Sequence, residues 1–187
     1  VTINAPHEDG KADYSAEVGA LAASGADELA VLGYVDQGGL GIIQASLDAG
    51  AFKRFVVGDG MIGQSIIDRI GDDMIGTFGT LPGGVSEGRA KFVQMATKAG
   101  INGEGPYVTT SYDAAALIVL AMQAAGSTNR SAIRSKVMMV ANAPGEKILP
   151  GELAKGLKIL KAGGDVDYVG ASSVEFNDVG EVFGTYR

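Results

Sequence analysis

Short apolar runs alternate with helical apolar patterns along the first 80 residues. A short apolar run bounded by glycine or polar residues is typical of a strand in a parallel sheet, whereas apolar residues three or four apart indicate a helix. The segments that fit strands are residues 1–5, 27–33, 54–58 and 74–80. The segments that fit helices are residues 14–24, 38–50 and 65–70. This order predicts an α/β fold, with a parallel sheet flanked by helices on both faces.

The pattern changes after LPGGV, residues 81–85, where glycine and proline favour a break in regular structure. The segments beyond it with helical spacing are residues 87–99, 108–126, 131–140 and 151–162. Strand character returns only at the end, where residues 172–176 and 181–186 are joined by a turn at 177–180 and predict a hairpin. LPGGV is therefore the predicted hinge, or the boundary between residues 1–81 and residues 82–187.

The composition of the chain excludes several classes of function. The chain has 187 residues, 46% of them hydrophobic, and a formal net charge of −7, which argues against nucleic-acid binding. It has no cysteine, which excludes disulfides, thiolate catalysis and cysteine-ligated metals. The longest apolar stretch, residues 114–125, is shorter than the ~20 residues that a membrane span needs, so no membrane insertion is expected. No signal peptide pattern opens the given sequence.

The most informative stretch is RFVVGDGMIG, residues 54–63. Residues just past the carboxyl end of a parallel strand lie where open α/β sheets bind ligands. Asp59 holds this position between Gly58 and Gly60, which leave its carboxylate sterically open. A charge-assisted hydrogen bond from such a carboxylate to an ammonium group is about twice as strong as a neutral one. The alternative is that Asp59 caps the following helix or shapes a turn.

The loop after the preceding strand holds two further candidates, Tyr34 and Asp36. Tyr34 either donates a hydrogen bond to a ligand or packs at the edge of the sheet. Asp36 either contacts the ligand or is the N-cap of the helix that begins at residue 38. No metal site is predicted, because the only histidine, His7, lies in a polar loop and is expected to be solvated.

GDGMIG, residues 58–63, fits the G-x-G-x-x-G pattern of dinucleotide sites, but a lone match is a weak signal. The acidic residue that should follow the next strand is missing, because Asp72 and Asp73 precede it. Ser111 has no histidine nearby and lies at a predicted helix start, where serine is an ordinary cap. Neither a nucleotide cofactor nor a serine nucleophile is therefore expected.

The chain resembles the leucine/isoleucine/valine-binding proteins, which have the type I periplasmic binding protein fold. The order and spacing of several segments carry the resemblance, which runs along nearly the whole chain but only onto the second half of such a protein. These segments are DYSAEV, GADELAVLGY, GGLGIIQASLDAG, FVVGDG, GTFGTLP and PYVTTSYDAAALIVLAMQAAGS.

The resemblance implies two α/β lobes with the ligand between them. Residues 1–81 would be most of the C-terminal lobe without its first strand and helix, and residues 82–187 the helical and hairpin part that returns to the N-terminal lobe. This chain would thus be an incomplete part of the two-lobed protein. Asp59 takes the place of the acidic residue that accepts the α-ammonium of an amino acid. A tyrosine is usual in the preceding loop; alignment puts it on Tyr34, or leaves Val35 or Asp36 in its place.

The expected function is therefore that of the solute-binding component of an ABC-type importer, a periplasmic or lipid-anchored extracytoplasmic protein without enzymatic activity or cofactor. It would bind an amino acid or similar small polar ligand, close at the hinge and dock on a membrane permease. Two alternatives remain open. One is a Rossmann-like enzyme that uses a nucleotide or sugar phosphate, and the other is a sensory ligand-binding domain of the same fold.

Overall fold

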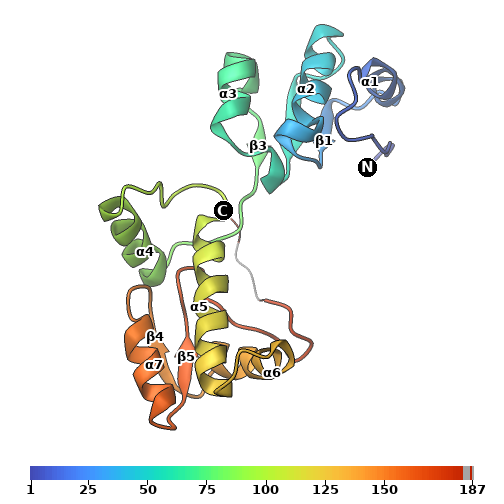
Figure 1. The fold of residues 1–187 in the computed structure, drawn as a ribbon. Helices are drawn as coiled ribbons and strands as arrows, with labels where there is room; N and C mark the ends of the chain where they lie inside the picture. Colours follow the sequence, from blue (N-terminus) through green and yellow to red (C-terminus); the bar gives the residue numbers. More distant parts are fainter. Residues whose placement is uncertain (183–185, 187) are drawn as a thin grey trace. The chain divides into compact units, whose positions relative to one another are not determined.

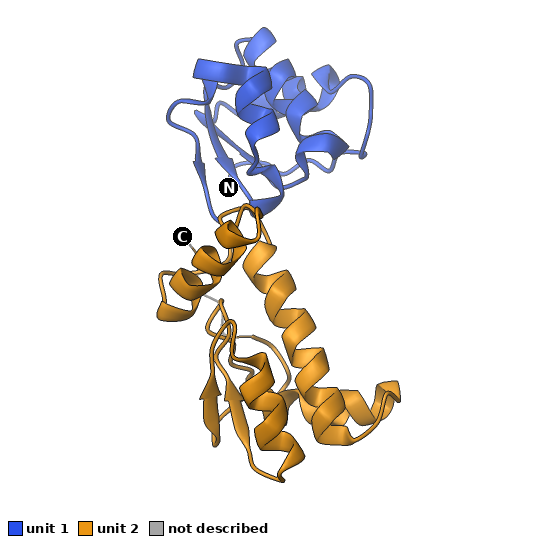
Figure 2. Cartoon of the chain, turned by 60° about the vertical axis from the view of Figure 1, so that its left-hand side comes forward, with its two compact units in different colours: residues 1–81 blue, residues 82–187 orange. Residues whose placement is uncertain are grey.

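The computed structural model describes residues 1–182 and 186, which form two compact units, Val1–Leu81 and Pro82–Arg187 (Figures 1 and 2). The elements of the first unit are α1 (Ser15–Ala22), β1 (Glu28–Val31), η1 (Val35–Gln37), α2 (Gly39–Asp48), β2 (Arg54–Val57), η2 (Asp59–Met61), α3 (Gln64–Ile70), η3 (Gly71–Met74) and β3 (Phe78–Gly79). Those of the second are α4 (Glu87–Lys98), α5 (Val108–Ala125), α6 (Arg130–Ala141), β4 (Glu146–Ile148), α7 (Leu153–Lys161) and β5 (Val166–Tyr168).

The first unit is built on a parallel sheet of order β1-β2-β3. Leu29 and Val31 of β1, with Phe55 and Val57 of β2, are buried in one core with residues of α1, α2 and α3. The alternate positions of β1 and β2 are exposed. Among the described residues, the helices therefore cover one face of this sheet, and the predicted cover on the second face is not present.

The opening segment, Val1–Ala5, was predicted as a strand, and the structure assigns it no strand. Among the described residues, no backbone hydrogen bond joins this segment to a neighbour. A strand exists only where its peptide groups find partners, so apolar alternation alone does not make one.

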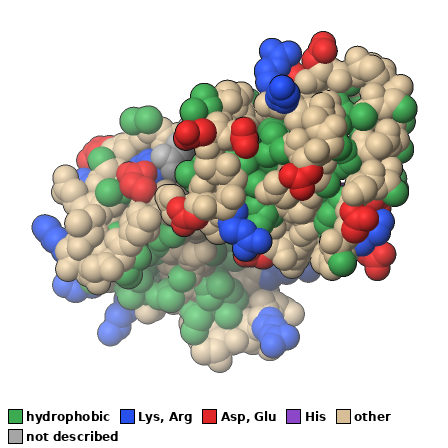
Figure 3. Space-filling view, turned by 90° about the horizontal axis from the view of Figure 1, so that it is seen from above, with side chains coloured by type: hydrophobic (Ala, Val, Ile, Leu, Met, Phe, Trp, Pro, Cys, Tyr) green, Lys and Arg blue, Asp and Glu red, His purple; other side chains and the backbone are tan. Residues whose placement is uncertain are grey.

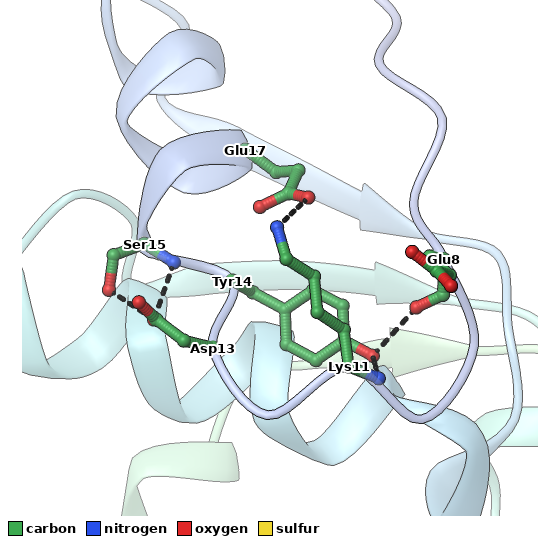
Figure 4. Close-up of polar contacts among 6 residues, drawn as sticks. All are labelled: Glu8, Lys11, Asp13, Tyr14, Ser15 and Glu17. Atoms are coloured by element: carbon green, nitrogen blue, oxygen red, sulfur yellow. Dashed lines mark hydrogen bonds and ion pairs between the residues drawn. The ribbon is translucent and has the colours of Figure 1, made fainter.

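A polar loop ties the start of the chain to α1 and α2. The Tyr14 hydroxyl donates to the Glu8 carbonyl at 2.9 Å and accepts from the Lys11 amide at 3.0 Å (Figure 4). The Lys11 ammonium bonds Glu17 at 2.6 Å, and this contact raises the pKa of Lys11 and lowers that of Glu17. The Tyr14 ring fills the space beside Gly38, where any side chain would collide with it.

The second unit holds two strands that the pattern of the sequence does not predict. β4 and β5 pair in parallel, with Ile148, Val166 and Tyr168 almost wholly buried against α5, α6 and α7. Each strand has only three residues, which is too short for an apolar run to stand out beside the helical patterns. The strand character predicted for residues 172–176 reduces to one antiparallel bridge between Phe176 and Val182, and residues 183–185 of the predicted hairpin lie outside the described residues.

One buried carboxylate, that of Asp113 on α5, organises the second unit. Its Oδ1 accepts from the Tyr168 hydroxyl and the Ala171 amide, both at 2.8 Å. Its Oδ2 accepts from the Ser172 amide at 2.7 Å and the Ser172 hydroxyl at 2.5 Å. Because four donors satisfy it, this carboxylate fixes the chain after β5 onto α5.

α5 is long and apolar enough, by length and composition, to cross a membrane. It also packs against α6 and α7, and Leu117, Leu120 and Ala121 are buried in the core that they share. The core helix of a globular unit has the same composition, so this feature is weak evidence for a span.

Candidate functional site

The candidate residues meet where β1 and β2 end. The two strands run parallel, with Val31 paired to Val57, so their carboxyl ends lie at the same edge of the sheet. The amide of Gly58 still donates to the Val31 carbonyl at 3.4 Å, and the chain then leaves the sheet into η2. The loops that follow the two strands are therefore neighbours, as expected for parallel strands.

Tyr34 lies directly against Gly60. A Cβ placed on Gly60 would be 2.8 Å from Cδ1 of Tyr34 and 2.5 Å from the carbonyl oxygen of Gly33. Tyr34 nevertheless remains 58% exposed, so the residue is open to solvent. A glycine is needed at position 60 because the loop after β1 passes so close to it.

Asp59 adjoins this contact and is half-buried. Its Oδ1 accepts from the amide of Gly60 at 2.9 Å, so it shapes a turn. It caps no helix, because α3 has Gly63 at its N-cap and no side-chain cap. Among the residues that the structure describes, its second oxygen, Oδ2, receives no hydrogen bond, so the carboxylate keeps acceptor capacity.

Asp36 lies in η1, two residues beyond Tyr34, and is exposed. The N-cap alternative for it is wrong, since the N-cap of α2 is Gly38 without a side-chain hydrogen bond. Segments 32–44 and 58–64 contain no lysine or arginine, so the two loops carry only the negative charges of Asp36 and Asp59. This edge of the sheet is therefore an acidic surface, and it favours a cationic group over an anionic one.

A buried methionine packs between the loops that follow β1 and β2. Met61 of η2 is 1% exposed, and its sulfur occupies the space beside Gly39, where any side chain would collide with it. The carbonyl of Tyr34 accepts from the amides of Gln37 at 3.2 Å and Gly39 at 3.0 Å, which fixes the turn of η1. Tyr34 and Asp59 therefore stand on loops that are held by the core of the unit.

His7 is a further neighbour of this edge. It is half-buried, its Nε2 would be 3.2 Å from a Cβ on Gly33, and its ring lies edge-on to Tyr14 at 6.2 Å. Asp9 faces it at 3.7 Å. The expectation of a solvated loop residue is wrong, and no local signal could have revealed it, since the contact depends on how residues 1–11 fold back on β1.

The glycines of residues 58–63 do not form a dinucleotide fingerprint on the first strand of a unit, since they follow β2. Within the described residues, no group of three histidine, cysteine, aspartate or glutamate side chains is placed to hold a metal ion. Two hollows lie along β1, and neither is lined by Tyr34 or Asp59. Tyr34 is exposed and Asp59 is half-buried at this edge of the sheet.

Comparison with known proteins bears on the fold. No protein-family model and no curated protein matches the chain. The crystal structure of the leucine binding protein LivK from Thermotoga maritima MSB8 resembles this chain, with 19% sequence identity and a TM-score of 0.69. The match covers 95% of this chain and 45% of the LivK chain. The structure of a periplasmic binding protein type 1 from Bordetella pertussis Tohama I also resembles it, with 21% sequence identity and a TM-score of 0.62. That match covers 73% of this chain and 41% of the other.

The chain thus spans less than half the length of the solved structures that it resembles. At this identity the likeness shows the fold. The chain has an α/β fold with parallel sheets and flanking helices, which matches about half of a type I periplasmic binding protein.

Proposed function

We propose that this chain is part of the solute-binding component of an ABC-type importer, and that Asp59 and Tyr34 bind the cationic group of an amino acid or similar small polar ligand. The observation that carries the proposal is the contact of Tyr34 with Gly60, beside Asp59, at the carboxyl ends of two adjacent parallel strands. Both solved structures that resemble the chain are named as binding proteins, one of them as leucine binding.

The chemistry of the two side chains supports a cationic ligand. Oδ2 of Asp59 is available to accept a charge-assisted hydrogen bond from an ammonium group. An exposed aromatic ring such as that of Tyr34 attracts a cation through its quadrupole, by about 0.5–1 kcal/mol. Of the other predicted site residues, Gly60 leaves room for the Tyr34 ring rather than for the ligand, and Gly58 carries no side chain beside Asp59. Asp36 adds a negative charge to the loop after β1.

The remaining parts of the proposal follow from this function. A solute-binding component works outside the cytoplasm and has a membrane permease as its partner. Division of the chain between Leu81 and Pro82 is compatible with two lobes, of which Val1–Leu81 would be the one that carries Asp59. No bond is made or broken in this function, because binding and release are its only steps.

The test is a thermal-shift screen followed by calorimetry, with amino acids, small carboxylates, sugars and nucleotides as ligands. A ligand at 100 times its dissociation constant raises stability by ~2.7 kcal/mol. Asp59→Asn should weaken the binding of an amino acid roughly tenfold or more, because it removes the charged acceptor. Asp27→Asn is the matched control, since Asp27 is exposed at the opposite end of the same sheet.

The proposal fails if no ligand with an ammonium group binds, or if Asp59→Asn binds it as tightly as Asp27→Asn does. Binding of nucleotides alone would favour the Rossmann-like enzyme.

A further inference from the structure

The first unit has far more acidic than basic residues. Val1–Leu81 contains twelve Asp and Glu residues but only four Lys and Arg residues. The four basic residues lie away from the loops that follow β1 and β2: Lys11 bonds Glu17, Lys53 and Arg54 stand at the amino end of β2, and Arg69 belongs to α3. These two loops therefore hold a negative charge that no basic residue of their own neutralises.

A third acidic segment adjoins the same edge of the sheet. The Gly10 amide donates to the Gln37 carbonyl at 3.1 Å, which holds the loop that contains Asp9 against η1. The Asp9 side chain is 67% exposed. Asp9 and Asp36 therefore add to the negative field of Asp59 at the carboxyl ends of the two strands.

Apolar surface lies beside these carboxylates. Leu32 is 76% exposed, and its Cδ2 is 3.7 Å from the position of a Cβ on Gly58. Tyr34 packs in the same way against Gly60. Because Gly58 and Gly60 flank Asp59 in the chain, Leu32 and Tyr34 are both neighbours of Asp59. Figure 3 shows that acidic side chains stand among exposed hydrophobic ones on the face of the molecule that it draws.

A cationic group on an apolar stem suits both features. The side chains of lysine and arginine pack their methylene groups on apolar surface and keep the charged end in water. A guanidinium group also stacks on aromatic rings. A zwitterionic amino acid has no net charge, so a negative field attracts its ammonium group and repels its carboxylate. A ligand with one more cationic group gains a net attraction.

We infer that the ligand of this site has a second cationic group, and is thus a basic amino acid or a diamine. Oδ2 of Asp59 accepts from one ammonium group, the methylene stem lies on Leu32 and Tyr34, and Asp36 binds the second cationic group. This inference rests on the proposed function and narrows its class of ligand.

The test is isothermal titration calorimetry of the full chain with two matched pairs of ligands. Citrulline has the shape of arginine without the charge on its side chain, and norleucine is lysine without the terminal ammonium group. We expect arginine and lysine to bind at least tenfold more tightly than citrulline and norleucine. This preference should shrink when sodium chloride is raised from about 20 to about 300 mM, because salt screens exposed charges.

A fifth ligand, 1,5-diaminopentane, is lysine without its carboxylate and separates the two kinds of dication. If it binds more tightly than lysine, the site is one for diamines, and if it binds more weakly, the site is one for basic amino acids.

Asp36→Asn should reduce the preference for arginine over citrulline at least threefold, because it removes the charge assigned to the second cationic group. Asp27→Asn is the matched control, since it removes the same charge at the opposite end of the sheet, and it should leave the preference unchanged. Both residues are exposed, so circular dichroism should show both variants folded.

Equal binding of arginine and citrulline would overturn the inference, and so would a preference that Asp36→Asn leaves as large as Asp27→Asn does. If citrulline and norleucine bind as tightly as their charged counterparts, and Asp59→Asn still weakens that binding, the proposed function stands and only this inference fails. If no amino acid binds at all, the proposed function fails as well.

Discussion

Gly60 offers the sharpest test of how the candidate site is built. An alanine there would place its Cβ 2.5 Å from the Gly33 carbonyl oxygen and 2.8 Å from Cδ1 of Tyr34. The backbone of the loop after β1 must then shift, because a carbonyl oxygen cannot rotate away as a side chain can. Gly58→Ala is the matched control, since its Cβ would meet only Cδ2 of Leu32, at an ordinary 3.7 Å.

The size of the effect follows from two opposing contributions. Overpacking of a tight site costs about 1–3 kcal/mol. Alanine in place of glycine stabilises by about 0.4–1 kcal/mol, because it restricts the unfolded chain. Gly60→Ala should therefore destabilise the first unit by about 1–2 kcal/mol, whereas Gly58→Ala should be neutral or slightly stabilising. The two variants should differ by about 2 kcal/mol, or roughly 30-fold in the unfolding equilibrium.

The assay must report on the first unit alone, because a chain of two units need not unfold in one step. Hydrogen exchange of the β1 and β2 amides meets this need, since it measures the free energy of opening locally. Equal protection in Gly60→Ala and Gly58→Ala would refute the proposed contact of Tyr34 with Gly60, and with it the geometry of the candidate site.

Three further predictions concern the second unit. Asp113→Asn should destabilise the second unit by about 3 kcal/mol in chemical denaturation, because the amide nitrogen cannot accept a hydrogen bond from a backbone donor. The control Asp165→Asn changes an exposed residue and should be neutral. Equal denaturation midpoints for the two variants would contradict the hydrogen bonds of the Asp113 carboxylate. Burial, and then the Asp113 charge, raise the pKa of Tyr168 above its ordinary value of 10.0, so the stability that this group contributes is complete below pH 10 and falls above it, where the unfolded chain ionises first. A tyrosinate absorbance titration should therefore show one phenol that ionises only as the unit unfolds. This late ionisation should be absent from the Tyr168→Phe variant. Asn142→Ala should lower the free energy of unfolding by about 1–3 kcal/mol and speed hydrogen exchange at the Phe176 amide. The reason is that the Asn142 side chain accepts from the Phe176 amide and donates to the Phe176 carbonyl. Unchanged exchange at Phe176 would contradict this contact.

The sequence predicted the elements that are long or periodic. Helices α2, α4 and α5 begin and end within about two residues of the predicted bounds, because glycines and capping residues mark their ends. The strands β1 and β2 were also predicted, since their runs are apolar and bounded by polar or glycine residues. These local signals were sufficient for the α/β class, which the solved structures confirm at fold level.

Other features lay beyond local signals. β4 and β5 are strands because each pairs with the other and is covered by helices, not because three residues such as Glu146–Ile148 favour a strand. Val1–Ala5 has strand character and no partner, so it forms none. The neighbourhood of Tyr34 and Gly60 follows from parallel pairing and could be expected, whereas the place of His7 against Gly33 is set by tertiary packing.

The central claim is that Asp59 and Tyr34 bind a cationic ligand at the carboxyl ends of β1 and β2. The most direct measurement is a heteronuclear NMR titration of the ¹⁵N-labelled chain with the amino acids, read at the amides of Tyr34, Asp59 and Gly60. The account predicts saturable shifts at these amides with one or a few amino acids, and none in Asp59→Asn. Shifts confined to other parts of the chain, or shifts at these amides that persist unchanged in Asp59→Asn, would contradict it.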